Sequence, residues 1–179
     1  MMLKTENTKI KIITMKKLLF ICLAFISSCE VKTIEVPVKG GEIAIGPNTG
    51  SKFYIVSDDN VELTKTLINA YNNMDIDGMY EVLPDTVMWF APKLKDPIPA
   101  DRKFMKEYFS QYDSISQVVQ GYIPHQWEGQ ENTVVSVASR EIKYKKDGTI
   151  EDERLFERFF IKDNKIFRVM AWSAEWNTN

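Results

Sequence analysis

The spacing of the apolar residues changes at Asp113, and this change constrains the fold more than any other feature of the chain. Before Asp113, apolar residues recur at helical spacing and predict a helix over 61–73, a short helix beginning at Asp75, and a third helix capped by Asp101. A β-branched and aromatic segment at 86–90 predicts one short strand among these helices. After Asp113 the period is two, which predicts strands over residues 114–127, 133–144, 149–161 and 166–176. This order predicts an α+β fold in which three N-terminal helices pack on a curved, mainly antiparallel sheet.

Turn residues indicate how these strands are connected. Asp147-Gly148 and Asp163-Asn164 each stand between two alternating segments, and both pairs favour the tight turns of β-hairpins. The proline-rich stretch at residues 92–99 predicts a loop before the third helix.

The first residues have the pattern of an export signal. Two lysines precede a short apolar run over residues 18–26, which is shorter than the roughly 20 residues of a membrane-spanning helix. A run of this length suits the apolar region of a secretory signal. It ends in Ser-Ser-Cys29, and this ending resembles the lipobox of bacterial lipoproteins.

The resemblance to a lipobox implies a diacylglycerol on the Cys29 sulfur, cleavage before Cys29 and an acylated new N-terminus. Two or more acyl chains hold a protein stably on a membrane, where a single chain is marginal. The expected location is therefore the cell envelope, with the protein anchored to the outer membrane and facing either the periplasm or the surface. Two alternatives stay open: an ordinary signal peptide in which Cys29 is incidental, and a true start at Met15.

Residues 1–28 thus form the predicted signal peptide, and residues 29–56 follow it as a predicted lipid-anchored linker. Glycine and proline are concentrated in this linker, and helical periodicity is absent. Within it, apolar residues between 34 and 45 can pair as a short ribbon, and residues 52–56 can lie as a strap against the core. The folded domain is predicted to span residues 57–179.

The composition excludes several classes of function. The net charge is −2 and no basic stripe follows the leader, so nucleic acid is not an expected partner. Cys22 lies in the leader and Cys29 is the lipidation site, which leaves no disulfide and no cysteine nucleophile in the mature chain. One histidine, His125, does not make up a metal site, and no glycine-rich phosphate loop is present. We therefore expect neither a metal nor a cofactor.

One segment, residues 72–92, carries a resemblance to a known superfamily. Asn72 precedes the helix start Asp75-x-Asp-Gly, Asp85 opens the first strand, and a proline follows that strand. Together with the Asp-Asn-Lys turn and the aromatic final strand, this pattern resembles the nuclear transport factor two-like superfamily, which includes ketosteroid isomerases and SnoaL-like polyketide cyclases. The resemblance covers about residues 58–176. It implies a cone-shaped fold with a pocket between the helices and the concave face of the sheet.

The resemblance also implies where isomerase chemistry would be placed. Counting from the shared helix start, the tyrosine donor falls on Leu67, the carboxylate base on Phe90, and the acidic donor on Phe156 or Glu157. Since Leu67 and Phe90 carry only hydrocarbon, ketosteroid-type isomerisation is not expected.

Two side chains remain as candidates for acid–base chemistry. His125 can act as a base near neutral pH, although a lone histidine beside a strand bend is more often structural. Glu141, Glu157 and nearby arginines alternate along adjacent strands, which favours cross-strand ion pairs on the solvent face. An inward Glu157 or Arg158 would instead be a polar anchor in the pocket. The basic cluster at 143–146 faces acids across its hairpin and is interpreted as a solvated hairpin end.

The sequence favours a small apolar ligand, because aromatic and sulfur-containing side chains fall where the pocket of this superfamily would lie. The predicted ligand-binding residues are Tyr71, Met79, Met88, Phe90, Phe104, Trp127 and Glu157. The last predicted strand is apolar on both faces, although a sheet with one solvated face should alternate with polar residues. The expected partners are therefore the membrane and a second copy of the chain, which would cover the sheet in a homodimer.

These observations give three functional hypotheses. The favoured one is an envelope lipoprotein whose pocket binds a small apolar ligand without catalysis. The second is a SnoaL-like isomerase, cyclase or dehydratase that uses His125 or Glu157. The third is an interaction module that docks a partner protein on the outer face of its sheet.

Overall fold

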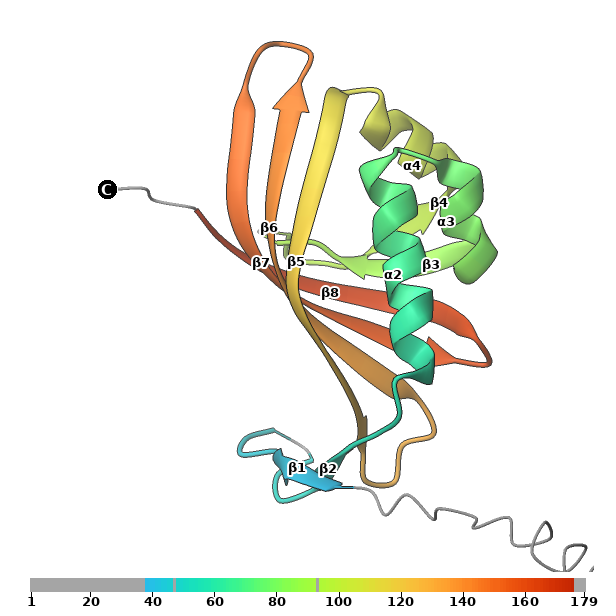
Figure 1. Cartoon of the computed structure of the whole chain (residues 1–179), viewed down its shortest axis with the longest axis vertical. Coiled ribbons are helices and arrows are strands. Elements are labelled where there is room, and N and C mark those ends of the chain that lie inside the picture. Colours follow the sequence, from blue (N-terminus) through green and yellow to red (C-terminus); the bar gives the residue numbers. More distant parts are fainter. Residues whose placement is uncertain (1–37, 47, 93, 176–179) are drawn as a thin grey trace, which may run out of the picture. The chain divides into compact units, whose positions relative to one another are not determined.

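The computed structural model describes residues 38–46, 48–92 and 94–175. The predicted leader and the predicted lipidation site Cys29 lie outside these residues. No helix within the described ranges combines the length and the apolar character needed to cross a membrane. The described residues form one curved sheet and three helices, so the predicted α+β class is confirmed (Figure 1).

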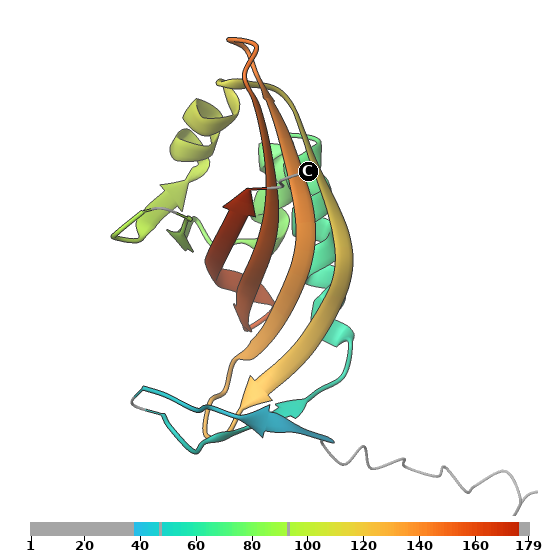
Figure 2. The same ribbon diagram turned by 90° about the vertical axis from the view of Figure 1, so that its left-hand side faces the viewer.

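The sheet has eight strands in the order β1-β2-β5-β6-β7-β8-β3-β4, and all neighbours are antiparallel except β8 and β3. The strands are β1 (Val38–Glu42), β2 (Lys52–Ile55), β3 (Thr86–Phe90), β4 (Ile98–Asp101), β5 (Tyr112–Trp127), β6 (Thr133–Lys145), β7 (Ile150–Lys162) and β8 (Lys165–Glu175). The four strands predicted after Asp113 agree with β5 to β8 within two residues at each end. Figure 2 shows how the long strands bend along their length.

The three helices are α2 (Asp59–Asn72), α3 (Ile76–Val82) and α4 (Arg102–Phe109). Two of them begin at side-chain caps that the sequence predicts. The Asp75 carboxylate accepts the Gly78 N–H at 3.1 Å, and the Asp101 carboxylate accepts the Phe104 N–H at 2.8 Å.

Both predicted hairpin turns are present. Gly148 has a φ of 86°, and its N–H donates to the Lys145 carbonyl at 2.9 Å. Asp163 and Asn164 both have positive φ, at 51° and 56°, which is the backbone of the tight turn that matches the twist of a hairpin. These turns set the register between β6 and β7 and between β7 and β8.

The strand β3 joins the sheet through a contact that the sequence does not predict. Met88, Trp89 and Phe90 pair in parallel with Arg168, Val169 and Met170 of β8. The short edge strand β4 begins at the end of the predicted proline loop and pairs only with β3. Pro99 is tolerated in β4 because an edge strand does not need every N–H for pairing.

The segment predicted as a linker contributes two strands to the sheet. The β1 and β2 strands pair with each other, and β2 pairs with the C-terminal end of β5 through Phe53, Tyr54 and Ile55. The predicted strap over residues 52–56 corresponds to β2. The predicted ribbon differs from the structure, because Val38 pairs with Ile55 of β2 and not with the apolar residues at 43–45. The sheet therefore begins ahead of the predicted domain boundary at residue 57.

The core lies between the three helices and the inner face of the sheet, which we define as the face that the helices cover (Figure 1). Val135, Val137 and Ile166 are fully buried there. The Asn72 side chain ties the end of α2 to β5, because its amide donates to the Gln117 carbonyl at 3.0 Å and accepts the Gln117 N–H at 2.7 Å. This clamp fixes Gln117 at the cavity described next.

Candidate functional site

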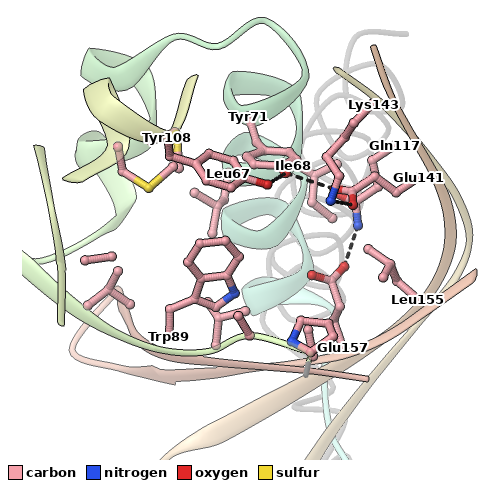
Figure 3. Close-up of a pocket in the computed structure, with 18 of the residues that line it drawn as sticks. Leu67, Ile68, Tyr71, Trp89, Tyr108, Gln117, Glu141, Lys143, Leu155 and Glu157 are labelled. Carbon is pink, nitrogen blue, oxygen red and sulfur yellow. Dashed lines mark hydrogen bonds and ion pairs between the residues drawn. The ribbon is translucent and has the colours of Figure 1, made fainter. Parts of the chain in front are cut away.

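A cavity of about 270 Å³ lies between the helices and the inner face of the sheet. Figure 3 shows that its walls come from α2, α4, β3 and the long strands, with side chains pointing into a common space. Most of the wall is apolar. The apolar lining includes Leu67, Ile68, Met79, Leu83, Val87, Trp89, Ala100, Met105, Leu155, Phe159 and Val169.

Polar side chains gather on the sheet side of this cavity. We call them the polar cluster, which consists of Tyr71, Tyr108, Gln117, Glu141, Lys143 and Glu157 (Figure 3). They come from two helices and three neighbouring strands, so only the folded chain brings them together.

Glu157 is the most unusual member of the cluster. Its side chain lines the cavity and is only 8% exposed, and the Gln117 side-chain amide donates to its carboxyl group. Burial and, to a smaller extent, the nearby Glu141 carboxylate raise the pKa of Glu157 to about 8, against the opposing effects of Gln117 and Lys143. Glu157 is therefore largely a neutral carboxylic acid at pH 7, with a proton to donate.

Gln117 holds Glu157 in a fixed place. Its backbone is clamped by Asn72, and its side-chain amide also donates to the Ser139 hydroxyl at 3.0 Å. Because both amide hydrogens of Gln117 are used within the fold, its orientation is set before any ligand arrives.

A chain of hydrogen bonds runs through the rest of the cluster. The Tyr71 hydroxyl donates to Glu141 at 2.9 Å, and the Tyr108 and Tyr71 hydroxyls lie 3.1 Å apart. Since Tyr71 has one proton and gives it to Glu141, Tyr108 donates to Tyr71. Burial raises the pKa of both tyrosines above the ordinary value, and Glu141 adds to this effect for Tyr71, so both hydroxyls stay protonated.

Lys143 neutralises part of the acidic charge. Its ammonium lies 2.9 Å from Glu141 and 3.3 Å from Glu151, whose carboxylate also pairs with Lys145 at 2.5 Å. Burial opposes the charge on Lys143, yet Glu141 and other neighbours raise the pKa of this lysine above its usual range. Besides Glu157, the cavity wall still contains three glutamates against one lysine, because Glu153 lines it too.

This arrangement combines an apolar cavity with a fixed proton donor. A neutral carboxylic acid can donate a hydrogen bond to a ligand oxygen or pass it a proton, and the apolar surroundings strengthen either interaction. The excess of carboxylates disfavours an anionic ligand. Among the described residues, no group of three or more histidine, cysteine or acidic side chains is arranged to hold a metal ion.

Comparisons with known proteins bear on the fold. No family profile and no curated protein matches the sequence. Among solved structures, a proposed aromatic ring hydroxylase from Novosphingobium aromaticivorans matches with a TM-score of 0.53 at 15% identity, covering 66% of this chain and 94% of that one. A proposed ketosteroid isomerase from Kribbella flavida matches with a TM-score of 0.51 at 13% identity, covering 70% and 84%. An LEH-like epoxide hydrolase from M. tuberculosis matches with a TM-score of 0.50 at 10% identity, covering 64% and 82%.

The described part of the chain therefore shares the α+β fold of these solved structures. The resemblance read from residues 72–92 is supported at this level, and identities this low carry the fold alone. The cavity of this chain lies between the helices and the sheet of this fold.

Of the predicted ligand-binding residues, the structure places Tyr71, Met79 and Glu157 in the cavity wall. Met88 and Phe90 are displaced from it by one position in β3, because Val87 and Trp89 are the side chains that face the cavity. Met88 is 37% exposed, and Phe90 lines a second hollow, which shares Ala91, Pro92 and Ala171 with the wall of the cavity. These two placements are corrections to the sequence analysis.

Two further aromatic residues lie behind or outside the wall. Phe104 packs edge-on against Trp89 with their ring centroids 6.0 Å apart, so it supports the wall without lining the cavity. Trp127 lies on the opposite face of the sheet, where it meets Phe160 at 5.9 Å. The register shift between Val119 and Gly121 changes the alternation of β5, so that odd-numbered residues face inwards at Gln117 but outwards at His125 and Trp127.

His125 is not part of the cavity. It is buried beside Trp127 and the Phe53 ring of β2, and its Nδ1 lies 3.1 Å from the Ile123 carbonyl. Burial lowers the pKa of His125, which keeps the ring neutral at pH 7. Its position indicates a structural role in the junction of β2 and β5.

Sequence reasoning missed most of the polar cluster. It assigned Glu141 to the solvent face and Lys143 to a solvated hairpin end, whereas both are buried on the inner face. A usable signal was the alternation of β7, where Glu157 stands between the inward Leu155 and Phe159. The same period places Glu141 and Lys143 on the face of Val135 and Val137.

Proposed function

We propose that this domain binds a small, uncharged and mainly apolar molecule in the cavity, and that Glu157 donates a hydrogen bond to an oxygen of that molecule. The observation that carries this proposal is the buried Glu157 in the wall of a mainly apolar cavity, where burial raises the pKa of its carboxyl group to about 8. Leaving such a group without a partner is costly, and a ligand oxygen would satisfy its proton.

The size and charge of the cavity narrow the ligand class. A cavity of about 150 Å³ lined by apolar side chains is known to hold one benzene ring, so a volume of about 270 Å³ suits two fused rings. Trp89 and Tyr108 offer aromatic surfaces for such rings. The glutamates of the wall favour a neutral molecule over its carboxylate analogue.

A matched pair of fluorescent compounds tests this ligand class. We expect 2-naphthol, which is neutral at pH 7 and carries one oxygen, to bind at least about tenfold more tightly than the anion 2-naphthoate. Fluorescence titration of the purified protein measures both. Ala171→Trp places a large ring in the cavity wall and should abolish binding, whereas Ala174→Trp, in an exposed position of the same strand, should not. Equal affinity for the two compounds, or binding unaffected by Ala171→Trp, would contradict the proposal.

Two substitutions of Glu157 separate the hydrogen bond from the shape of the site. Glutamine keeps a donor at this position and leucine removes it, so 2-naphthol should bind about three- to tenfold more weakly to Glu157→Leu than to Glu157→Gln. Naphthalene, which lacks the oxygen, should bind to both variants with the same affinity.

The same carboxyl group supports a second candidate function, acid catalysis. The names of the solved relatives of this fold, a ketosteroid isomerase and an epoxide hydrolase among them, make neutral ketones and epoxides reasonable first substrates. In such a reaction Glu157 would pass its proton to the substrate oxygen, so turnover should fall as the pH rises through about 8.

Glu157→Gln distinguishes the two functions, because it keeps a donor but has no proton to transfer. A substrate panel assayed by product analysis should show turnover with the native protein and a loss of about a hundredfold or more in the variant. Product formation that survives this substitution would exclude Glu157 as the acid. Ligand binding without any turnover would support the binding function and exclude acid catalysis of the substrates tested.

We also propose that the domain is presented at the cell envelope by a lipid on Cys29. The export signal and the Ser-Ser-Cys29 ending support this part of the proposal.

A further inference from the structure

The outer face of the sheet, which is opposite to the cavity, carries an unusual grouping of arginines and rings. The Arg158 guanidinium lies 5.6 to 5.9 Å from the ring centroids of Trp127, Phe156 and Trp172. Phe156 and Trp172 pair across β7 and β8 and are 42% and 45% exposed. Large exposed aromatic side chains that lie together on a surface indicate a contact site.

A second arginine repeats this arrangement one step along the sheet. Arg168 lies 5.2 to 5.8 Å from the ring centroids of Phe90, Phe160 and Phe167. We call Arg158, Arg168 and these six rings the outer arginine–aromatic patch. The rings hold the two guanidinium groups in place, so little side-chain entropy remains to be lost on binding.

Neither arginine of the patch has a carboxylate partner among the described residues. Neither takes part in an ion pair there, and the Arg158 Nε is buried without a hydrogen-bond acceptor. Asp152, the acid on the same face of β7, is already paired with Arg140 at 2.6 Å. A planar guanidinium that is fixed and unpaired is suited to a carboxylate, which it can bind through two parallel hydrogen bonds.

A hollow adjoins the patch and offers an anchor point. It is lined by Phe90, Met170 and Trp172, together with Leu94 and residues at the end of β3. An apolar or aromatic side chain fits this lining, and buried aromatic anchors beside arginines provide most of the binding energy in many protein interfaces.

We propose that the outer arginine–aromatic patch binds an acidic segment of a partner protein, with carboxylates on Arg158 and Arg168 and an aromatic side chain in the adjoining hollow. Charge complementarity decides between this partner and a second copy of the chain. In a two-fold contact the patch would face itself, which sets arginines against arginines without a free acid from β7 to pair with them.

Three synthetic peptides with a glycine and serine background test the proposal on the purified full-length protein. The first carries glutamate and phenylalanine, the second lysine and phenylalanine, and the third glutamate alone. By fluorescence anisotropy, we expect the first to bind at least about tenfold more tightly than either of the others. Equal binding of the lysine peptide, or no binding of the glutamate–phenylalanine peptide, would overturn the proposal.

Variants of the patch locate the contact. Arg158→Gln and Trp172→Ser should each weaken the first peptide by about tenfold, while Ile150→Ser, at an exposed position of β7 outside the patch, should not. Trp172→Ser keeps the test valid if Arg158→Gln fails to fold, because Trp172 is half exposed. Sedimentation velocity on the same samples tests whether a second copy of the chain binds the patch. If the native protein is a dimer and both patch variants are monomers, the proposal is overturned, and the patch binds a second copy of the chain instead.

Discussion

Replacing Cys29 with serine should abolish fatty-acid labelling of the protein and move most of it out of the membrane fraction. Serine has no thiol to accept the diacylglycerol, and acyl chains supply nearly all the membrane affinity of a lipoprotein. Metabolic labelling with a fatty-acid analogue, followed by fractionation and intact mass measurement, gives three independent readouts. The native protein should have an N-terminus at Cys29 and the added mass of its acyl chains.

Cys22→Ser is the matched control for this experiment. Cys22 lies within the apolar run of the leader, so its replacement removes a thiol from the same precursor without touching the predicted acceptor. Labelling should persist in this variant. If the native protein takes up no label, or if Cys29→Ser is labelled as strongly as the native protein, the lipoprotein assignment is wrong.

Replacing Glu157 with glutamine should flatten the dependence of stability on pH. The folded-state pKa of Glu157 is about 8, well above its ordinary value of 4.5. Between these values the folded chain holds a proton that the unfolded chain releases. The contribution of Glu157 to stability is therefore fully present below about pH 4.5 and is lost as the pH rises through about 8. Each pKa unit between the folded and the ordinary value corresponds to about 1.4 kcal/mol. The expected change in the free energy of unfolding is therefore on the order of a few kcal/mol.

Urea unfolding between pH 5 and pH 9 measures this effect as the difference in slope between the native protein and the variant. Glu131→Gln is the control, because Glu131 is exposed and ion-paired with Lys162 at 2.7 Å, and its pKa is lowered by that lysine. Its carboxyl group therefore takes up a proton only below this pH window. Parallel stability profiles for the native protein and Glu157→Gln would show that Glu157 is ionised in the folded state.

Local patterns in the sequence predict most of the secondary structure. The strands β5 to β8 follow from strict alternation, and Gly148 and Asn164 mark the turns between them. The starts of α3 and α4 follow from Asp75 and Asp101, whose side chains cap the first turn. In each case the signal and the structure that it specifies are close together in the chain.

The failures in the sequence analysis have physical reasons. In β3 every residue from Val87 to Phe90 is apolar, so alternation does not say which pair faces the cavity, and the register was assigned one position off. Burying Glu141 and Lys143 is unfavourable for either alone. They are stable inside because they pair with each other and Glu141 also accepts from Tyr71, and residues from distant elements cannot be matched from one sequence.

The parallel contact between β3 and β8 ties folding to the last residues of the chain. Met88 and Phe90 can pair with Arg168 and Met170 only after those residues have been synthesised. The pairing of β4 depends on β3 in turn. Pairings between segments so distant form slowly, because the intervening chain must be ordered first. During synthesis the sheet therefore stays incomplete until β8 has emerged. If the chain is exported as we propose, the export machinery meets a precursor that has not yet closed its own sheet.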